Sequence, residues 1–272
     1  MNNTWLAFGL TAFAGLSTGI GSAIAFLAKK TNTRFLAVSL GFSAGVMIYV
    51  SMIEIFVKSR EALSGVWGAK AGGWATIASF FAGIAFIALI DKLIPKAENP
   101  HELHTVEDMA AAGRKEVHRD HQHLMRTGFF TALAIGIHNF PEGLATFIAG
   151  LQDPKIAIPI AIAIAIHNIP EGIAVSVPVY YATGSKRRAF RYSFLSGLSE
   201  PVGAVVGYLL LRPFMSDTLL GIVFGMVAGI MIYISLDELL PSAREYGEAH
   251  LSLYGLIGGM GVMAASLQLF VA

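Results

Sequence analysis

The chain of 272 residues has no cysteine, 55% hydrophobic residues, 14% charged residues and a formal net charge of +1. Ordinary soluble domains carry about 25% charged residues, so this chain lacks the charge that a fully solvated surface needs. The composition excludes a disordered chain, a collagen, a disulfide-stapled scaffold and a nucleic-acid binder with a basic face. Together with a mean hydropathy of +0.63, it indicates a polytopic membrane protein.

Helices that cross a bilayer need about 20 mainly apolar residues. Eight segments of this kind follow one another in the chain, at residues 4–28, 35–57, 71–94, 127–151, 156–182, 189–211, 218–240 and 251–271. Most connections are short and polar, which predicts an all-α bundle of eight transmembrane helices in a single transmembrane domain, residues 1–272. The long connection, 95–126, is charged and rich in histidine, and we expect it to be a mobile loop.

The distribution of lysine and arginine predicts the orientation. Eight spans place both termini on one side of the membrane, and the connections that carry more positive charge face the cytosol. With the termini outside, the inner connections hold fourteen of these residues and the outer connections five. The first span lacks the positive leader of a cleaved signal peptide and is expected to remain. We therefore predict that both termini are outside and that 95–126 is cytosolic.

Residues 45–54 (GVMIYVSMIE) recur as residues 229–238 (GIMIYISLDE), and residues 15–21 (GLSTGIG) resemble residues 197–203 (GLSEPVG). The first three spans thus match the last three, and in the predicted topology the two copies cross the membrane in opposite directions. Inverted three-helix repeats of this type are typical of transporters, with the substrate site near the midplane between them. The fourth and fifth spans lie between the two copies.

A second repeat occupies those central spans, as residues 138–143 (HNFPEG) and 167–172 (HNIPEG). His138 and His167 are each the twelfth residue of their predicted span, which places them near the bilayer centre at about 1.5 Å of rise per residue. Glu200 is the twelfth residue of the sixth span. Three helices therefore bring ionisable groups to one depth.

The motif has the chemistry of a metal site. Its His and Glu are four residues apart and share a helix face, its Pro frees a carbonyl four residues earlier, and its Gly allows close helix approach. Charged groups at mid-membrane cost at least about 2.5–3.5 kcal/mol each, so the three carboxylates must be protonated or neutralised by cations. Imidazole, carboxylate and amide ligands suit Zn²⁺, Fe²⁺, Mn²⁺, Co²⁺ or Cd²⁺, and one or two ions could bind. The candidate metal ligands are His138, Asn139, Glu142, His167, Asn168, Glu171 and Glu200.

The first repeat supplies a candidate path for the ion, whose residues are Met47, Ser51, Glu54, Met231, Ser235 and Glu238. In each copy these residues lie at positions i, i+4 and i+7, which form one helix face. Glu54 is a candidate outer relay, and Glu238, with Asp237, a candidate inner relay. The alternative is that these carboxylates lie at the interface and are solvated by headgroup water.

The histidines of the long loop, His101, His104, His118, His121 and His123, have spacings that allow weak Zn²⁺ binding. They are either a sensor or sink for released metal, or part of an ordinary hydrophilic linker.

The two H-N-x-P-E-G motifs, the eight spans and the histidine-rich loop resemble the ZIP (Zrt-, Irt-like) metal transporters, over the whole chain and most closely in the bacterial ZupT-like branch. The resemblance implies uptake of divalent metal into the cytosol through a binuclear site in a bacterial inner membrane. It implies that His138, Glu142, His167 and Glu171 are primary ligands, and that Asn139 and Asn168 complete the second position.

The resemblance also implies a broad substrate range, with Zn²⁺ foremost and Fe²⁺, Mn²⁺, Co²⁺ and Cd²⁺ as competitors. Members of the family are thought to move one helix bundle rigidly against another, often as homodimers. Glu54 and Glu200 stand where members differ, and some members carry Asp where Asn168 stands. We therefore expect metal ions and the lipid bilayer as partners, a homodimer, and no nucleic acid.

Two other classes of protein compete with a transporter. An intramembrane zinc metalloprotease could use a metal held by His and Glu to activate water, but it needs a general base as in H-E-x-x-H and has no use for the inverted repeat. A metal-gated receptor would explain the central site but not the two relay carboxylates. The sequence favours a transporter that is not an enzyme, with zinc as its substrate and no catalytic cofactor.

Overall fold

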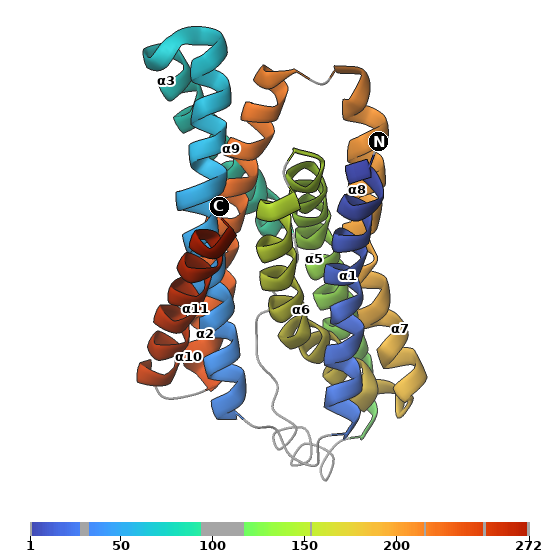
Figure 1. Cartoon of the computed structure of the whole chain (residues 1–272). Coiled ribbons are helices and arrows are strands. Elements are labelled where there is room, and N and C mark those ends of the chain that lie inside the picture. Colours follow the sequence, from blue (N-terminus) through green and yellow to red (C-terminus); the bar gives the residue numbers. More distant parts are fainter. Residues whose placement is uncertain are drawn as a thin grey trace.

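The structure, a computed structural model, describes residues 2–27, 33–93, 117–152, 154–214, 216–246 and 249–270. In these ranges every regular element is a helix, as the all-α prediction required (Figure 1). The elements are α1 (Asn2–Leu27), α2 (Thr33–Val50), the π-helix η1 (Ser51–Ile55), α3 (Phe56–Leu93), α5 (Val117–Gln152), α6 (Pro154–Thr183), α7 (Lys186–Gly197), α8 (Ser199–Leu211), the 3₁₀-helix η3 (Arg212–Phe214), α9 (Asp217–Ile234), the π-helix η4 (Ser235–Leu239), α10 (Leu240–Tyr246) and α11 (Ala249–Phe270).

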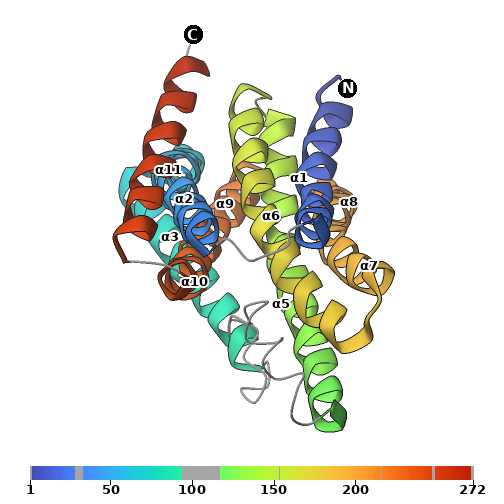
Figure 2. The same cartoon turned by 90° about the horizontal axis from the view of Figure 1, so that it is seen from below.

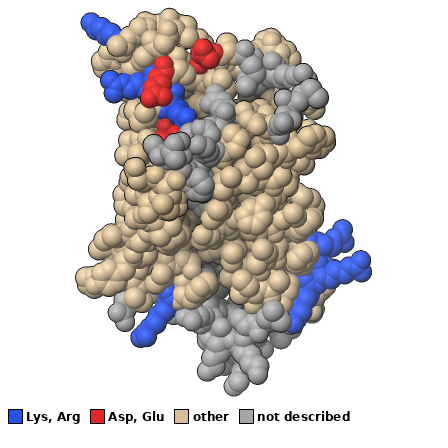
Figure 3. Space-filling model, viewed as in Figure 1, with Lys and Arg blue, Asp and Glu red and all other residues tan. Residues whose placement is uncertain are grey.

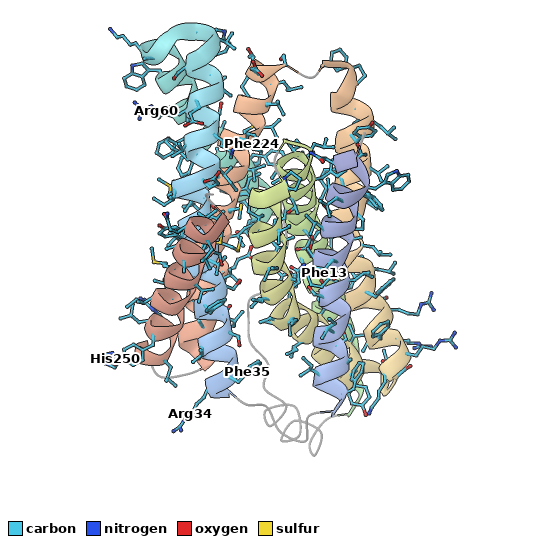
Figure 4. The ribbon with its side chains drawn as sticks, viewed as in Figure 1. Phe13, Arg34, Phe35, Arg60, Phe224 and His250 are labelled. Carbon is cyan, nitrogen blue, oxygen red and sulfur yellow. The ribbon has the colours of Figure 1, made fainter. Side chains whose placement is uncertain are left out.

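The surface matches a helical membrane protein. Within the described residues, five helical stretches are long and apolar enough to cross a bilayer: Asn3–Phe26, Ala37–Lys92, Lys186–Leu210, Asp217–Arg244 and His250–Leu269. On the face shown in Figure 3, charged side chains gather at the two ends and leave an uncharged belt between them. In Figure 4, Arg60 lies at one end, Arg34 and His250 lie at the other, and the exposed Phe13 lies between them on α1. Exposed apolar side chains at that height are stable in contact with lipid.

The connection after the second predicted span is helical. Residues 58–70, expected to be a polar link, continue η1 into α3, and the chain reverses at Gly68, where φ is 80° and ψ is 160°. This positive φ is open to glycine without steric cost. The link is rich in Lys, Arg, Glu, Ala and Leu, which favour helix, so the segment stays helical on both sides of the reversal.

The helix α5 begins at Val117, inside the segment 95–126 that the sequence suggested was a loop. That expectation is wrong for residues 117–126, because no proline or glycine interrupts the chain between them and a helix can extend past the membrane surface. Residues 94–116 lie outside the described residues.

The helices gather in two groups (Figures 1 and 2). One contains α1, α5, α6, α7 and α8, and the other contains α2, α3, α9, α10 and α11. The most extensive contacts lie within the groups, between α1 and α6 and between α5 and α6 in the first, and between α3 and α9 and between α2 and α11 in the second. The helix α2 also reaches α6, and α5 reaches α9, so these helices form the seam between the groups.

Close helix crossings within the groups depend on glycine, and α11 supplies a matched pair of residues for a test. A Cβ on Gly259 would overlap the carbonyl oxygen of Phe42 on α2, whereas a Cβ on the adjacent Gly258 meets nothing within 4 Å. We expect Gly259→Ala to lower the free energy of unfolding by about 1–3 kcal/mol, because the helices must move apart.

The control Gly258→Ala should leave stability unchanged or raise it slightly, since alanine is the better helix former by about 1 kcal/mol. Thermal unfolding of the two purified variants in detergent compares them directly. Equal melting temperatures would contradict the close crossing of α2 and α11.

Candidate metal site

Five polar side chains of the two H-N-x-P-E-G motifs and of the sixth predicted span are buried inside the first group of helices. Asn139 and Glu142 lie on α5, Asn168 and Glu171 lie on α6, and Glu200 lies in the first turn of α8. Asn139, Asn168 and Glu200 have no exposed surface, and Glu142 is 1% and Glu171 6% exposed. The sequence predicted all five as candidate metal ligands, and the structure buries all five.

Asn168 joins three helices. Its Nδ2 donates to Oε1 of Glu200 on α8 and to the carbonyl oxygen of Ala14 on α1, the latter at 2.8 Å. Two oxygen atoms of this pair remain: Oδ1 of Asn168 and Oε2 of Glu200 are buried and have no hydrogen-bond partner within the described residues. Buried polar atoms nearly always have a partner, so two neighbouring exceptions need an explanation such as a bound ion.

Asn139 makes the corresponding link between α5 and α6. With its amide oriented so that the nitrogen faces the acceptors, Asn139 donates to Oε2 of Glu171 at 3.2 Å and to the carbonyl oxygen of Ile135 at 3.1 Å. Each motif asparagine thus holds a carboxylate of another helix. The sequence identified these residues as oxygen ligands and missed their second role as donors that position the carboxylates.

The electrostatics of this layer are unfavourable without a cation. Glu142, Glu171 and Glu200 are three carboxylates in one buried region, and among the residues that the structure describes no Lys or Arg side chain is buried. Removing a carboxylate from water costs several kcal/mol unless it is paired or protonated. A divalent cation would satisfy several of these oxygens together, as would protons.

The helices reach this depth through close contacts at the motif glycines. A Cβ on Gly143 would overlap the carbonyl oxygen of Glu200, and a Cβ on Gly172 would overlap that of Thr18. The close approach expected from the motif is therefore present on both α5 and α6. Bulky residues here would separate the helices that carry the carboxylates.

The sixth predicted span, 189–211, differs in detail. The helix α7 begins earlier, at Lys186, and a turn at Leu198 separates it from α8. The reason is local, because Pro201 has no N–H to donate to the carbonyl of Gly197 four residues earlier. The interruption places Glu200 in the first turn of α8, where its carboxylate meets Asn168.

The structure describes the backbone of the two motif histidines. His138 and His167 lie on α5 and α6, and their side chains are outside what the structure describes. Among the described side chains, no three His, Asp or Glu form a ready metal-binding group. The loop residues His101 and His104 lie outside the described residues. The side chains of His118, His121 and His123 are likewise not described, although their backbone begins α5.

The candidate path residues form a matching pair of segments. Met47, Ser51, Met231 and Ser235 are buried, and Glu238 is 8% exposed. The sequence pattern missed that Ser51 and Ser235 each begin a π-helix. Such bulges are frequent at functional sites but have no hydrophobic periodicity of their own, so no sequence signal announced them.

Glu54 differs from its counterpart Glu238. It is partly exposed and forms an ion pair with Lys58, one turn later, at 3.5 Å. A partly exposed pair of this kind adds little stability and leaves the carboxylate accessible.

Comparisons with known proteins agree with this architecture. A family model described as "ZIP Zinc transporter" matches residues 92–267. A "Zinc transporter ZupT" of Clostridium perfringens is 64% identical over 279 residues, covering 100% of this chain and 98% of that protein. Proteins of the same name from Lysinibacillus sphaericus and Nitratidesulfovibrio vulgaris are 64% and 62% identical, with 98% or more of each relative and 99% of this chain covered.

The three ZupT relatives match over nearly the entire length of this chain and of their own chains, at identities far above those of chance resemblance. These matches agree with the apolar helices of the structure, which are long enough to cross a membrane. They also confirm the expectation of a helical membrane transporter rather than an enzyme. The chain belongs to the ZIP zinc transporter family, and within it is similar to the bacterial ZupT transporters.

Proposed function

We propose that this protein carries divalent transition-metal ions, Zn²⁺ foremost, across the membrane into the cytosol through the site between α5, α6 and α8. The observation that carries the proposal is the buried layer of carboxylates and amides with no buried Lys or Arg among the described residues and with the unsatisfied oxygens of Asn168 and Glu200. Zinc is the cargo, and no catalytic cofactor is needed. The relatives named above, all described as zinc transporters, support the same function and give no support to a protease.

The two motifs would share the ligands as follows. His138, Glu142, His167 and Glu171 bind the ion directly, because His and Glu four residues apart share one face of each helix. Asn139, Asn168 and Glu200 contribute oxygens to a second position beside the first, so that the site is binuclear when full. Nitrogen and oxygen ligands of this kind also suit Fe²⁺, Mn²⁺, Co²⁺ and Cd²⁺, which we expect to compete with Zn²⁺.

The eight-span architecture with inverted repeats is part of the proposal. The support for it comes from residues at equivalent positions of the two repeated segments, 45–54 and 229–238. A Cβ on Gly45 would overlap the carbonyl oxygen of Leu256, and a Cβ on its counterpart Gly229 would overlap that of Phe80. The second span thus meets the eighth as the seventh meets the third, and Ser51 and Ser235 begin π-helices at the same place in each copy.

The orientation follows from the charge distribution. Both termini face outward, residues 95–126 lie at the cytosolic surface, and the protein works as a single transport domain in a bacterial inner membrane, as a homodimer. Incoming ions meet Glu54 and Ser51 on the outer half of the second span and leave past Glu238 and Ser235 on the inner half of the seventh. The loop histidines would bind released metal weakly.

Zinc uptake into proteoliposomes tests the function. The purified protein should accelerate accumulation of Zn²⁺ by the vesicles over protein-free vesicles of the same lipid, with Mg²⁺ as the ion that is not carried, because Mg²⁺ prefers all-oxygen ligands. Tight Zn²⁺ binding without uptake would refute transport and favour the receptor. Cleavage of a membrane peptide would favour the protease.

The outer relay gives a prediction of its own. Glu54→Ala should slow Zn²⁺ uptake several-fold, about threefold to tenfold, because an accessible carboxylate raises the local concentration of cations. Zinc binding to the detergent-solubilised protein should not change, since Glu54 is not part of the buried layer. Lys58→Ala, which frees the Glu54 carboxylate from its ion pair, should leave uptake equal or faster. If Glu54→Ala abolished binding, Glu54 would belong to the metal site itself.

A further inference from the structure

Thr18 on α1 is one of two buried threonines in the described helices, with Thr146 on α5, whose hydroxyl has no hydrogen-bond partner within the described residues. Threonine in a helix normally donates its hydroxyl hydrogen to the carbonyl four residues earlier. Thr11 bonds to Ala7 in this way at 3.0 Å, and Thr76 bonds to Gly72 at 3.0 Å. Thr18 has no exposed surface, and its Oγ1 has no hydrogen-bond partner within the described residues.

The reason is that the carbonyl which Thr18 would use is already occupied. The carbonyl oxygen of Ala14 accepts from Nδ2 of Asn168 at 2.8 Å and from Oγ of Ser17 at 2.5 Å. Within α1 the same oxygen also lies in reach of the backbone N–H four residues later, so these donors leave no lone pair free for a further hydroxyl. The same asparagine that holds Glu200 therefore leaves the Thr18 hydroxyl without its usual acceptor.

The surroundings of Thr18 provide no other hydrogen-bond partner for its hydroxyl among the described residues. The side chain packs on Gly197 of α7, where a Cβ would lie 2.7 Å from Oγ1 of Thr18. The nearby hydroxyl of Ser193 is directed at backbone oxygens, those of Thr18 at 3.2 Å and of Gly172 at 3.3 Å. An unsatisfied hydroxyl in a buried place costs about 1–3 kcal/mol, so a residue of this type is retained at a cost to stability.

The sequence repeat shows what Thr18 corresponds to. In the aligned segments 15–21 (GLSTGIG) and 197–203 (GLSEPVG), Thr18 stands where Glu200 stands. The contacts agree with the alignment, because the carbonyl of Glu200 meets Gly143 of the α5 motif and the carbonyl of Thr18 meets Gly172 of the α6 motif. Thr18 thus lies against the α6 motif in the same way as Glu200 lies against the α5 motif.

We propose that Thr18 is a further ligand of the transported ion, whose hydroxyl oxygen contacts the ion at the end of the site opposite to the Glu200 carboxylate. The inference rests on the proposed transport function. It makes the site unequal, with a charged oxygen at one end and a neutral one at the other, and the neutral end holds the ion less strongly. A hydroxyl oxygen favours harder ions, so Thr18 also biases selectivity toward Mn²⁺ and Zn²⁺ relative to Cd²⁺.

The test compares Thr18→Val with Thr11→Val in the full-length protein reconstituted in proteoliposomes. Both residues are buried threonines of α1, but the hydroxyl of Thr11 is satisfied within its own helix. Thr18→Val should raise the KM for Zn²⁺ uptake about threefold to tenfold, the worth of one oxygen contact, and should reduce Mn²⁺ uptake more than Cd²⁺ uptake. Thr18→Ser should restore wild-type kinetics, and Thr11→Val should match the wild type.

Thermal unfolding separates a ligand from a packing residue. Thr18→Val removes an unsatisfied polar atom at nearly constant volume, so its melting temperature in detergent should equal or exceed that of the wild type while uptake falls. If valine lowers the melting temperature, the comparison of Thr18→Ser with Thr18→Ala isolates the hydroxyl, and equal KM values in that pair would overturn the proposal.

These experiments also distinguish a failure of the Thr18 proposal from a failure of the proposed transport function. A wild-type protein that moves no Zn²⁺ would refute the proposed function itself. A wild type that transports, together with a Thr18→Val variant whose KM and Mn²⁺-to-Cd²⁺ ratio match those of Thr11→Val, would refute only the role of Thr18.

Discussion

Replacing Glu142 and Glu171 together by glutamine is expected to abolish zinc uptake and to make the metal-free protein more stable. Both carboxylates are buried, at 1% and 6% exposure, and Glu200 is buried in the same region. Glutamine keeps nearly the same shape and hydrogen-bonding reach but removes the negative charge. Without a bound cation, such carboxylates repel one another and have lost their hydration. Their presence in the buried layer therefore indicates a role in binding.

The two expected effects have different magnitudes. Uptake should fall below about one hundredth of the wild-type rate, since substitutions of groups around a bound metal already cost 10–100-fold. The free energy of unfolding of the metal-free protein should rise by about 1–4 kcal/mol, as large as the gain found when a buried ion pair is replaced by uncharged residues of similar volume. The wild type, but not the variant, should gain further stability when Zn²⁺ is added.

Vesicle uptake and melting temperature, each with and without Zn²⁺, provide the measurement. Glu61→Gln is the control, because this exposed glutamate of α3 lies outside the buried layer and should change neither quantity. A Glu142→Gln/Glu171→Gln variant that still transports would show that the ion passes elsewhere. Loss of uptake with lower stability would indicate that the two carboxylates serve the fold and not the cargo.

The chemistry-bearing positions of this site could be predicted from the sequence because each depends on local spacing. A His–Glu separation of four residues gives a shared face on any helix, and a span length gives the depth of Glu200. The repeated motifs likewise predicted the close helix contacts at Gly143 and Gly172. These properties follow from helical geometry and do not require knowledge of which helices are neighbours.

Other features depend on neighbours and left no trace in the pattern. That Asn168 donates to both Glu200 and Ala14 depends on where α1 and α8 lie relative to α6. The π-helices at Ser51 and Ser235 depend on one additional residue per turn, which apolar periodicity does not reveal. The start of α5 at Val117 is decided by a charged segment whose helix propensity is favourable but weak.

Asn168→Asp is expected to lower the stability of the metal-free protein and to tighten zinc binding. The amide nitrogen of Asn168 donates to Oε1 of Glu200 and to the carbonyl oxygen of Ala14. An aspartate has no hydrogen to donate when it is ionised, so three oxygen atoms would face one another without a donor. It would also add a fourth carboxylate to a region that already contains Glu142, Glu171 and Glu200.

We therefore expect the free energy of unfolding of the metal-free variant to fall by about 3–5 kcal/mol, the cost of leaving a buried charge without its partner. A divalent ion reverses the sign of this effect, because the fourth carboxylate becomes a ligand. The Zn²⁺-induced rise in melting temperature should exceed that of the wild type, and the affinity should increase by about tenfold or more.

Transport should become slower in Asn168→Asp even as binding strengthens, because an ion held by one more carboxylate leaves the site less readily. Asn168→Ala is the matched control, since it removes both donated hydrogen bonds without adding charge. It should lower the stability of the metal-free protein and leave the Zn²⁺-induced shift no larger than in the wild type. If zinc stabilised the aspartate variant no more than the alanine variant, Asn168 would lie away from the bound ion. Its only role would then be to hold Glu200 and α1 together.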